Sequence, residues 1–148
     1  MKKIFLIAGL LIASLIGISQ TQVSHKSRSQ ILNDEYTSGL FKTADGTIFD
    51  MENEHAQAYF NILDWLEGRI AGLQVFVSMS GTRIPVIRGS LASIYVDEMR
   101  IDPSFLNSLS SSDIAMIKVI KGPFAGAIGN GGGGTIAIYT FKGEDEED

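Results

Sequence analysis

Cysteine is absent from the 148 residues of the sequence. Its absence excludes disulfide bonds, thiol catalysis and zinc sites built from cysteine, and it also excludes a lipid attached to an N-terminal cysteine. Histidine is nearly absent, because His25 and His55 are the whole complement and lie far apart in the sequence. No carboxylate pair brackets either histidine at the spacing of metal ligands. We therefore expect two surface histidines, no metal site and no cofactor.

Catalytic motifs are lacking as well. No serine lies in a nucleophile elbow, and no carboxylate pair is flanked by residues that would form an apolar pocket. Asp97-Glu98 is better explained as a turn than as an acid–base pair. The run Gly131 to Gly134 invites comparison with a phosphate loop, but such a loop needs Lys-Ser or Lys-Thr directly after the glycines and a helix behind them. Because Thr135 opens a predicted strand instead, we expect the glycine run to form a tight turn. Since none of these catalytic patterns is present, we predict that the protein is not an enzyme.

Positive charge is in short supply, since 12 lysines and arginines face 17 aspartates and glutamates, for a net charge of −5. A chain of this charge is a poor partner for nucleic acid or for an anionic membrane surface. Much of the acidic excess lies in the run 144–148. We expect residues 143–148 to form a solvated acidic tail; the alternative is an electrostatic handle for a basic patch on a partner.

Residues 1–19 have the pattern of a secretory signal peptide. Met1-Lys2-Lys3 is a short basic start, the apolar run Ile4 to Ile18 follows, and small residues precede a cleavage point before Gln20. The alternative is a membrane anchor, but the apolar run is shorter than the ~20 residues that a spanning helix needs. We therefore predict export to the periplasm and no direct membrane span.

Two predicted strands flank the glycine-rich stretch that ends at Gly134. They cover Met116 to Ile120 and Thr135 to Phe141, and the second is rich in the β-branched and aromatic residues that favour strands. Gly122-Pro123 ends the first strand because proline has no N–H for the ladder, and Phe124 to Ile128 is long enough for one helical turn. Alternation predicts one face with Ile114, Met116, Lys118 and Ile120, and another with Ile117 and Val119.

The four consecutive glycines between these strands are Gly131, Gly132, Gly133 and Gly134. Glycines lose much conformational entropy when they become ordered. The run is therefore either a slack surface connection or a segment held where no Cβ would fit, and we predict the second.

Helical spacing of apolar residues predicts the main helix over Glu54 to Ile70, with Asn53 as its N-cap and Trp65 buried beside the apolar face. We expect Pro85 to lie in an edge strand. Further elements are predicted as strands at Leu73–Val77, Arg83–Arg88, Ser93–Asp97 and Met99–Ile101, and as a short helix from Asp102-Pro103 to Leu109. Alternating strands and helices predict an α/β (α+β) domain, with a small mixed sheet and helices packed on it.

The N-terminal residues 20–53 are predicted to form a linker that contains a β-hairpin. Asp45-Gly46 is a strong two-residue turn signal between Leu40–Thr43 and Thr47–Asp50. The domain itself is predicted to cover residues 54–142.

Four motifs in order resemble the plug domain of TonB-dependent outer-membrane receptors. Leu66 to Val75 reads LEGRIAGLQV, Ile87 to Ser90 reads IRGS, and Ile94 to Asp97 reads IYVD. Ile117 to Pro123 reads IKVIKGP, and the small residues and glycines up to Gly134 lead into TIAIYT. Together these motifs cover most of the chain from Ala56 to Phe141, and the fold of such plugs agrees with the one predicted from the sequence pattern.

The resemblance implies that the protein fills an outer-membrane β-barrel. In receptors that it resembles, the arginine of the I-R-G motif reaches acids on the inner wall of the barrel, and Arg88 matches that position. We therefore expect the partner-binding residues to be Arg83 and Arg88, whose forked guanidinium groups bind carboxylates, together with Gly131, Gly132, Gly133 and Gly134. The alternative for Arg88 is a solvated arginine at the end of a strand.

The residues after the predicted plug leave no length for membrane strands of ~10 residues each, so we expect the barrel to be formed by another chain. Candidate partners are a nutrient importer of the starch-utilisation type and a protein-secretion translocon such as that of type 9 secretion. We expect the protein in the periplasm, associated with the outer membrane. No convincing TonB box is present, since Gln30-Ile31-Leu32 is too short.

Two alternatives stay open. The protein could be a soluble periplasmic ligand-binding or accessory module that contacts a solute through the loops Ser78–Thr82 and Gly129–Gly134. It could also be a fragment of a longer gene product.

Overall fold

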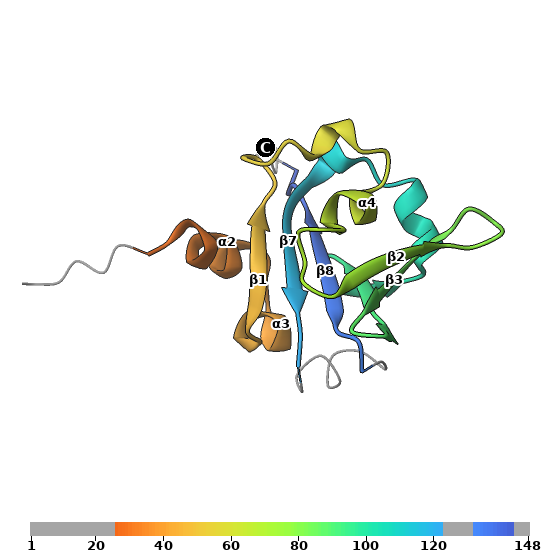
Figure 1. Ribbon diagram of the computed structural model, residues 1–148. Coiled ribbons are helices and arrows are strands. Elements are labelled where there is room, and N and C mark those ends of the chain that lie inside the picture. The colour runs from red at the N-terminus through yellow and green to blue at the C-terminus, as the bar shows by residue number, and fades with distance from the viewer. Residues whose placement is uncertain (1–25, 123–131, 144–148) are drawn as a thin grey trace, which may run out of the picture.

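The computed structural model describes residues 26–122 and 132–143, which form a five-stranded mixed sheet, a three-stranded antiparallel sheet and short helices (Figure 1). This arrangement confirms the predicted mixed α/β class. Several predictions concern residues outside the described ranges, namely the signal peptide, His25, the helical turn at 124–128, the residues 129–131 and the acidic run 144–148.

The larger sheet has the strand order β1-β7-β8-β5-β6. The two central strands, β7 and β8, are antiparallel, and they are the strands predicted on either side of the glycine run. β5 and β8 are parallel, whereas the other neighbours are antiparallel. The bounds are β1 (Gly46–Asp50), β5 (Ser93–Val96), β6 (Met99–Ile101), β7 (Ile114–Ile120) and β8 (Thr135–Thr140).

The pairing of β7 with β8 shifts register between Ile114 and Met116. Such an irregularity adds a residue to one strand and breaks the alternation of faces. As a result, Ile114 lies in the main core with Ile117 and Val119, whereas Met116 packs in a second cluster on the opposite face. The prediction that Ile114 shares a face with Met116 was therefore wrong.

The smaller sheet has the order β2-β3-β4, with bounds Leu73–Val77, Arg83–Ile87 and Ser90–Leu91. β2 and β3 form a hairpin that projects from the molecule (Figure 1). The prediction of an edge strand at Pro85 was wrong, because β3 is central. Proline is tolerated there because β4 pairs only with Val86 and Ile87, and the carbonyl of Pro85 accepts a bond from the N–H of Ala92 at 2.9 Å.

The predicted long helix over Glu54–Ile70 was wrong in extent. A 3-10 turn, η1 (Ala56–Ala58), is followed by a separate short helix, α4 (Ile62–Leu66). The side chain of Asn61 caps α4 by accepting a bond from the N–H of Leu63 at 3.0 Å, and this local bond competes with a continuous helix. Trp65 is buried as predicted.

The β5–β6 connection is a tight turn in which Asp97 and Glu98 both have positive φ angles, 47° and 66°. Both carboxylates accept hydrogen bonds from backbone groups. Asp97 accepts from the N–H of Thr140 at 3.0 Å, and Glu98 accepts from the N–H of Ser38 at 2.6 Å. Asp102 caps the following 3-10 helix as predicted. That helix, η2 (Pro103–Asn107), is followed by η3 (Ser111–Asp113).

The N-terminal residues fold as two helices, α2 (Arg28–Tyr36) and α3 (Gly39–Thr43), which we call the N-terminal cover. The predicted linker and hairpin were therefore wrong in this region, because β1 pairs with β7 rather than with residues 40–43. Gly46 serves close packing, not a hairpin turn: a Cβ there would lie 2.8 Å from the carbonyl oxygen of Val119.

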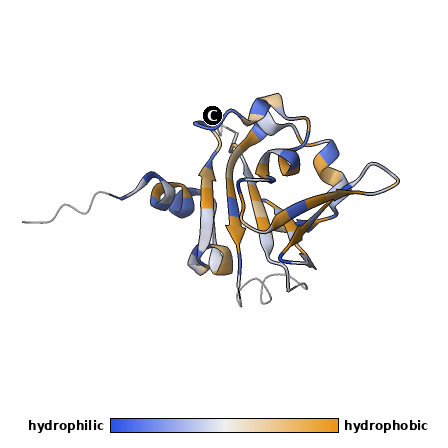
Figure 2. Cartoon of the chain, viewed as in Figure 1, coloured by the Kyte–Doolittle hydropathy of each residue, from blue (hydrophilic) through white to orange (hydrophobic). Residues whose placement is uncertain are grey.

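The larger sheet buries both of its faces. One face packs against α4, η2 and the smaller sheet and forms the main core, around Trp65, Leu66, Ile87 and Leu106. We call the two sheets together with α4 the body. The other face lies under the N-terminal cover, where Leu32 is the one buried residue of α2. Figure 2 shows the contrast between the hydrophobic strands and the largely hydrophilic α2.

Candidate functional site

Arg83, at the start of β3, forms an ion pair inside the body. Its Nε donates to a carboxylate oxygen of Asp64 in α4 at 2.6 Å. Both side chains are partly buried, and the bond to Asp64 raises the pKa of Arg83 above its ordinary value. Arg83 therefore links the smaller sheet to α4, which is a different role from the partner contact predicted for it.

Arg88, unlike Arg83, is exposed and has no carboxylate partner in the described residues. It follows β3 with φ at 53° and is exposed, and its backbone N–H donates to the carbonyl of Gly72 at 2.9 Å. A positive φ is uncommon for a residue with a side chain and persists where the surroundings fix the backbone. Within residues 26–122 and 132–143, its guanidinium group forms no ion pair. The guanidinium fork of Arg88 is thus not engaged by a carboxylate in the described part of the chain.

The described glycines of the run lie in different environments. A Cβ on Gly133 would lie 2.2 Å from the carbonyl oxygen of Ser90, whereas a Cβ on Gly132 would meet nothing closer than 3.9 Å. Gly134 has φ at 122°, and a Cβ there would lie 2.9 Å from the carbonyl oxygen of Ile120. The end of the run is therefore pressed against β4 and the end of β7, whereas Gly132 has room for a Cβ.

A cleft of about 860 Å³ lies between the two sheets, and we call it the inter-sheet cleft. Thr82 from the predicted loop 78–82 and Gly132 from the glycine run both line it, so the fold brings those two segments together. Its walls are mostly apolar, with Arg100 and Asp102 as the charged residues; the apolar residues are Ile84, Pro85, Leu91, Ala92, Ile94, Ile101 and Pro103.

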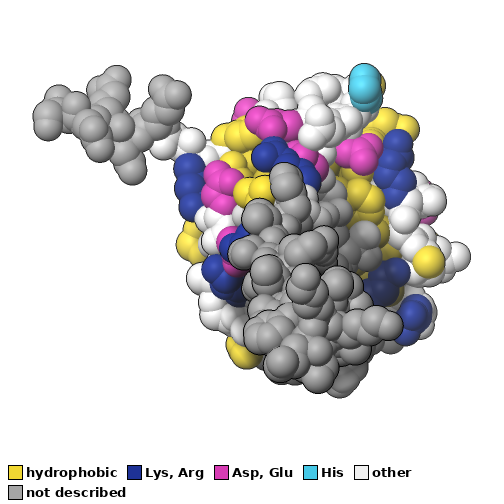
Figure 3. Space-filling model, turned by 90° about the vertical axis from the view of Figure 1, so that its left-hand side faces the viewer, with side chains coloured by type: hydrophobic (Ala, Val, Ile, Leu, Met, Phe, Trp, Pro, Cys, Tyr) yellow, Lys and Arg dark blue, Asp and Glu magenta, His cyan; other side chains and the backbone are white. Residues whose placement is uncertain are grey.

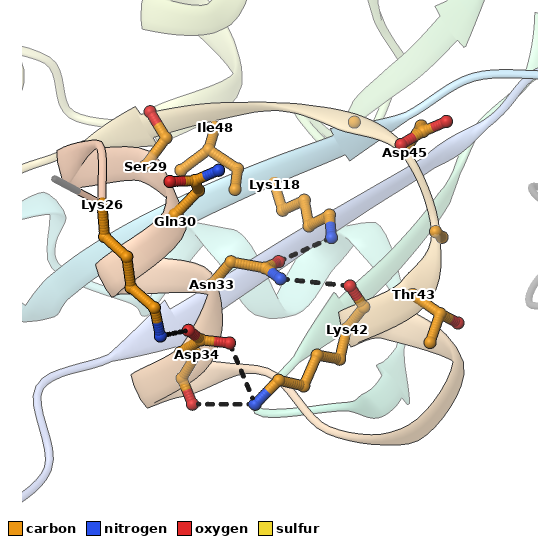
Figure 4. A pocket seen from close by; sticks show the side chains of 12 residues that line it. Lys26, Ser29, Gln30, Asn33, Asp34, Lys42, Thr43, Asp45, Ile48 and Lys118 are labelled. Carbon is orange, nitrogen blue, oxygen red and sulfur yellow. Dashed lines mark hydrogen bonds and ion pairs between the residues drawn. The ribbon is translucent and has the colours of Figure 1, made fainter. Parts of the chain in front are cut away.

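Sequence reasoning missed a polar cavity of about 460 Å³ between the N-terminal cover and the larger sheet (Figure 4). Lys118 of β7 lines it and is 2% exposed. Its Nζ donates to the side-chain oxygen of Asn33 at 2.7 Å and to the carbonyl of Phe41 at 2.6 Å. Burial lowers the pKa of Lys118 below its ordinary value. Alternation correctly placed Lys118 on the face opposite Ile117, but the cover that buries it was predicted to be a linker.

Other polar contacts hold the cover in place. Arg28 pairs with Asp50 at 2.8 Å and with Glu52 at 2.7 Å, and the hydrogen bond from Arg28 lowers the pKa of Asp50. Ser38 donates both its N–H and its hydroxyl to Glu98. Figure 3 shows the side on which α2 lies, where basic and acidic side chains lie beside one another in the part that the grey atoms leave visible.

Apolar side chains are exposed on the smaller sheet. Phe76, Val77 and Met79 lie on the β2–β3 hairpin and are 54%, 64% and 111% exposed, and Leu91 of β4 is 63% exposed. Hydroxyl groups of Ser78, Ser80 and Thr82 bond one another across the hairpin loop. Exposed apolar side chains that gather on one element are typical of an interaction surface.

Among the residues that the structure describes, no helix is long and apolar enough to cross a membrane. Within the same ranges, no three His, Asp or Glu side chains are grouped closely enough to hold a metal ion. His55 is exposed.

Comparison with known proteins adds to this description. The family model of the TonB-dependent Receptor Plug Domain matches residues 43–136. The comparison with curated proteins gave no significant match.

Several solved structures share the fold. The siderophore receptor PirA from Acinetobacter baumannii matches 66% of this chain at 24% identity and a TM-score of 0.54. The RagAB peptide importer matches 71% of this chain at 22% identity and a TM-score of 0.57. The G324V mutant of the ferric enterobactin receptor PfeA from Pseudomonas aeruginosa matches 72% of this chain at 23% identity and a TM-score of 0.55. The match covers 17%, 13% and 19% of those three chains, respectively.

Proposed function

Because the chain belongs to the family of TonB-dependent receptor plug domains, we propose that it is a non-enzymatic plug that closes or gates an outer-membrane β-barrel formed by another chain. Domains of this family sit within outer-membrane barrel receptors. We place the protein in the periplasm, associated with the outer membrane. The barrel belongs either to a nutrient importer or to a protein-secretion translocon such as that of type 9 secretion.

The match of the family model to the folded body carries this proposal. A wide barrel has an open lumen unless something fills it, and a compact body made of two sheets is suited to that task. The exposed apolar hairpin around Met79 and the glycine edge at Gly132 both supply surface for contact with a barrel wall.

Arg88 is the residue that we propose pairs with an acid on the barrel wall. Its guanidinium group is exposed and forms no ion pair in the described part of the chain, and its backbone is fixed by the bond to Gly72. A carboxylate on the partner would accept the fork bidentately. Arg83 is a weaker candidate for a partner contact because Asp64 already occupies its Nε.

Substitution of Arg88 by alanine tests this assignment. Loss of one partner of a buried charge pair costs ~2–5 kcal/mol of binding, so we expect weaker recovery of the barrel on immobilised protein with a nearly unchanged melting temperature. Arg83→Ala is the matched control, and we expect it to lower the melting temperature because it breaks the internal pair with Asp64. Equal losses of stability and of barrel recovery in Arg88→Ala would assign Arg88 an internal role.

The partner itself can be identified by crosslinking from the hairpin tip. A photoreactive residue in place of Met79, which is fully exposed, is activated in intact cells that make the protein. We expect a crosslinked product that contains an outer-membrane barrel protein, whose identity distinguishes importer from translocon. Recovery of soluble periplasmic partners alone would refute the plug proposal.

A second candidate is a soluble periplasmic ligand-binding or accessory module, and the inter-sheet cleft favours it. Thr82 and Gly132 line that cleft together, as expected if the two loops contact one solute. Tight binding of a small solute by the purified protein, with no recovery in the membrane fraction, would support this candidate over the plug.

A further inference from the structure

A separate cleft of about 480 Å³ lies between residues 57–60 and 107–112, and we call it the serine cleft. Two hydrogen bonds join these distant segments. Asn61 donates its Nδ2 to the side-chain oxygen of Asn107 at 3.0 Å, and Ser111 donates its hydroxyl to the carbonyl of Tyr59 at 3.0 Å. Asn61 is fully buried and Ser111 is 7% exposed, so the two walls are fixed to each other from inside the fold.

The lining of the serine cleft combines aromatic rings with neutral polar groups. Phe60 is 76% exposed and Tyr59 is 39% exposed, although both are large apolar side chains. Gln57, Asn107 and four serines supply amide and hydroxyl groups. In the described part of the chain, the side chain of Gln57 and the Nδ2 of Asn107 have no hydrogen-bond partner, so both can bind a ligand.

No charged side chain lines the serine cleft. In contrast, the polar cavity under the N-terminal cover is lined by Lys26, Lys42, Lys118 and two aspartates, and the inter-sheet cleft contains Arg100 and Asp102. A lining without charge gives an ionic ligand no compensation for its desolvation. The chemistry of the serine cleft therefore selects an uncharged ligand that has both apolar faces and many hydroxyl groups.

We propose that the serine cleft binds a ring of a neutral saccharide. A pyranose ring presents apolar C–H faces, which pack on aromatic rings, and an equatorial rim of hydroxyl groups, which bond to amides and hydroxyls. Phe60 and Tyr59 provide the aromatic surface, while Gln57 and Asn107 provide donors with free capacity. Recognition pockets typically combine apolar and aromatic walls with a few placed polar groups in this way.

The test uses the purified full chain and three neutral hexasaccharides: α-1,4-linked glucose, β-1,4-linked glucose and β-1,4-linked N-acetylglucosamine. We expect at least one of them, at millimolar concentration, to shift the amide resonances of residues 57–60 and 107–112 in NMR titration. Binding should weaken about tenfold in Phe60→Ala, because the variant loses an aromatic contact. Gln57→Ala should weaken it less.

Phe76→Ala is the matched control, because Phe76 is also an exposed phenylalanine but lies on the β2–β3 hairpin. It should bind the saccharide like the parent protein. If none of the three hexasaccharides shifts these resonances, the proposal is wrong; it is also wrong if Phe60→Ala and Phe76→Ala weaken binding equally. The experiment needs no barrel, so its outcome is independent of the proposed plug function.

Discussion

The body and the N-terminal cover are held in place by different forces. In the body, Trp65, Leu66 and Ile87 are completely buried in one continuous apolar core. The cover buries a single residue of α2, Leu32, and packs the partly buried rings of Tyr36 and Phe41 on the sheet. It depends more than the body does on polar contacts, namely the hydrogen bonds and ion pairs of Lys118, Arg28 and Glu98.

This difference separates stability that depends on buried area from stability that depends on charge. Apolar burial contributes roughly 25 cal/mol per Å² regardless of pH. Exposed ion pairs contribute ~0–1 kcal/mol each and vary with pH and salt. We therefore expect the cover to be released under conditions in which the body stays folded.

The largest expected effect is on the body. Trp65→Ala should lower the free energy of unfolding by ~3–5 kcal/mol, because it empties a fully buried site whose ring packs on Phe49 at 5.4 Å between centroids. Urea denaturation followed by far-UV circular dichroism measures this loss. A loss below about 1 kcal/mol would show that the core around α4 contributes little to stability. It would contradict the claim that apolar burial stabilises the body.

A second prediction concerns the end of the glycine run. Gly133→Val should cost ~1–3 kcal/mol, since its side chain would collide with the backbone of Ser90 and force the chain to move. Gly132→Val is the control and should be close to neutral, within about 0.5 kcal/mol, because a Cβ there makes only an ordinary contact, 3.9 Å from the hydroxyl oxygen of Ser90. If both variants are as thermally stable as the parent protein, the run is a slack connection.

The contact between body and cover gives a smaller, local effect. Lys118→Met removes the donor to Asn33 and Phe41 but also removes a buried charge, so we expect a global loss of ~1 kcal/mol. Hydrogen exchange should accelerate in residues 28–43 and stay slow in β7. Lys42→Met removes only an exposed ion pair with Asp34 inside the cover, so it should accelerate exchange in the cover less than Lys118→Met does. Equal acceleration in β7 would show that cover and body unfold as one unit.

The smallest expected effect is the response of the cover to acid. The pKa of Asp50 is lowered by Arg28, so the folded state holds this carboxylate ionised more firmly than the unfolded state does. Its contribution is complete above the unfolded pKa near 3.8 and disappears as the pH falls through the lower folded value. We expect faster exchange in α2 at that pH. The variant Asp50→Asn should lack this response, and a parent protein with none would contradict the prediction.

The sequence predicted the body far better than the cover. Strands β2, β5, β7 and β8 follow from runs of β-branched residues, and three of the four family motifs overlap them, whereas Ile87–Ser90 joins β3 to β4. The helix over 54–70 failed because apolar spacing alone does not show that the side chain of Asn61 caps a new, shorter helix. The hairpin predicted at Asp45-Gly46 was wrong because glycine is used both in tight turns and where two backbones approach closely. Here it allows the close approach of Val119.

In the candidate site, too, the sequence indicated residues of interest but not their contacts. Both arginines were proposed from the sequence as partner contacts, but the local pattern could not show that Asp64, which lies in α4 before β2, would pair with Arg83. Burial of Lys118 was hidden because its partners, Asn33 and Phe41, lie in residues whose local pattern resembles a linker. Contacts between distant residues are not encoded in local periodicity.

The pairing of Gly46 with Ile120 has a consequence for the order of events during synthesis. A ribosome delivers the chain from the N-terminus, so β1 emerges long before β7, and until then its hydrogen-bonding groups have no partner strand. Contacts between such distant residues form slowly, and an unpaired strand edge is prone to association with other chains. Until residue 120 is available, β1 therefore stays an open edge with which another chain can pair.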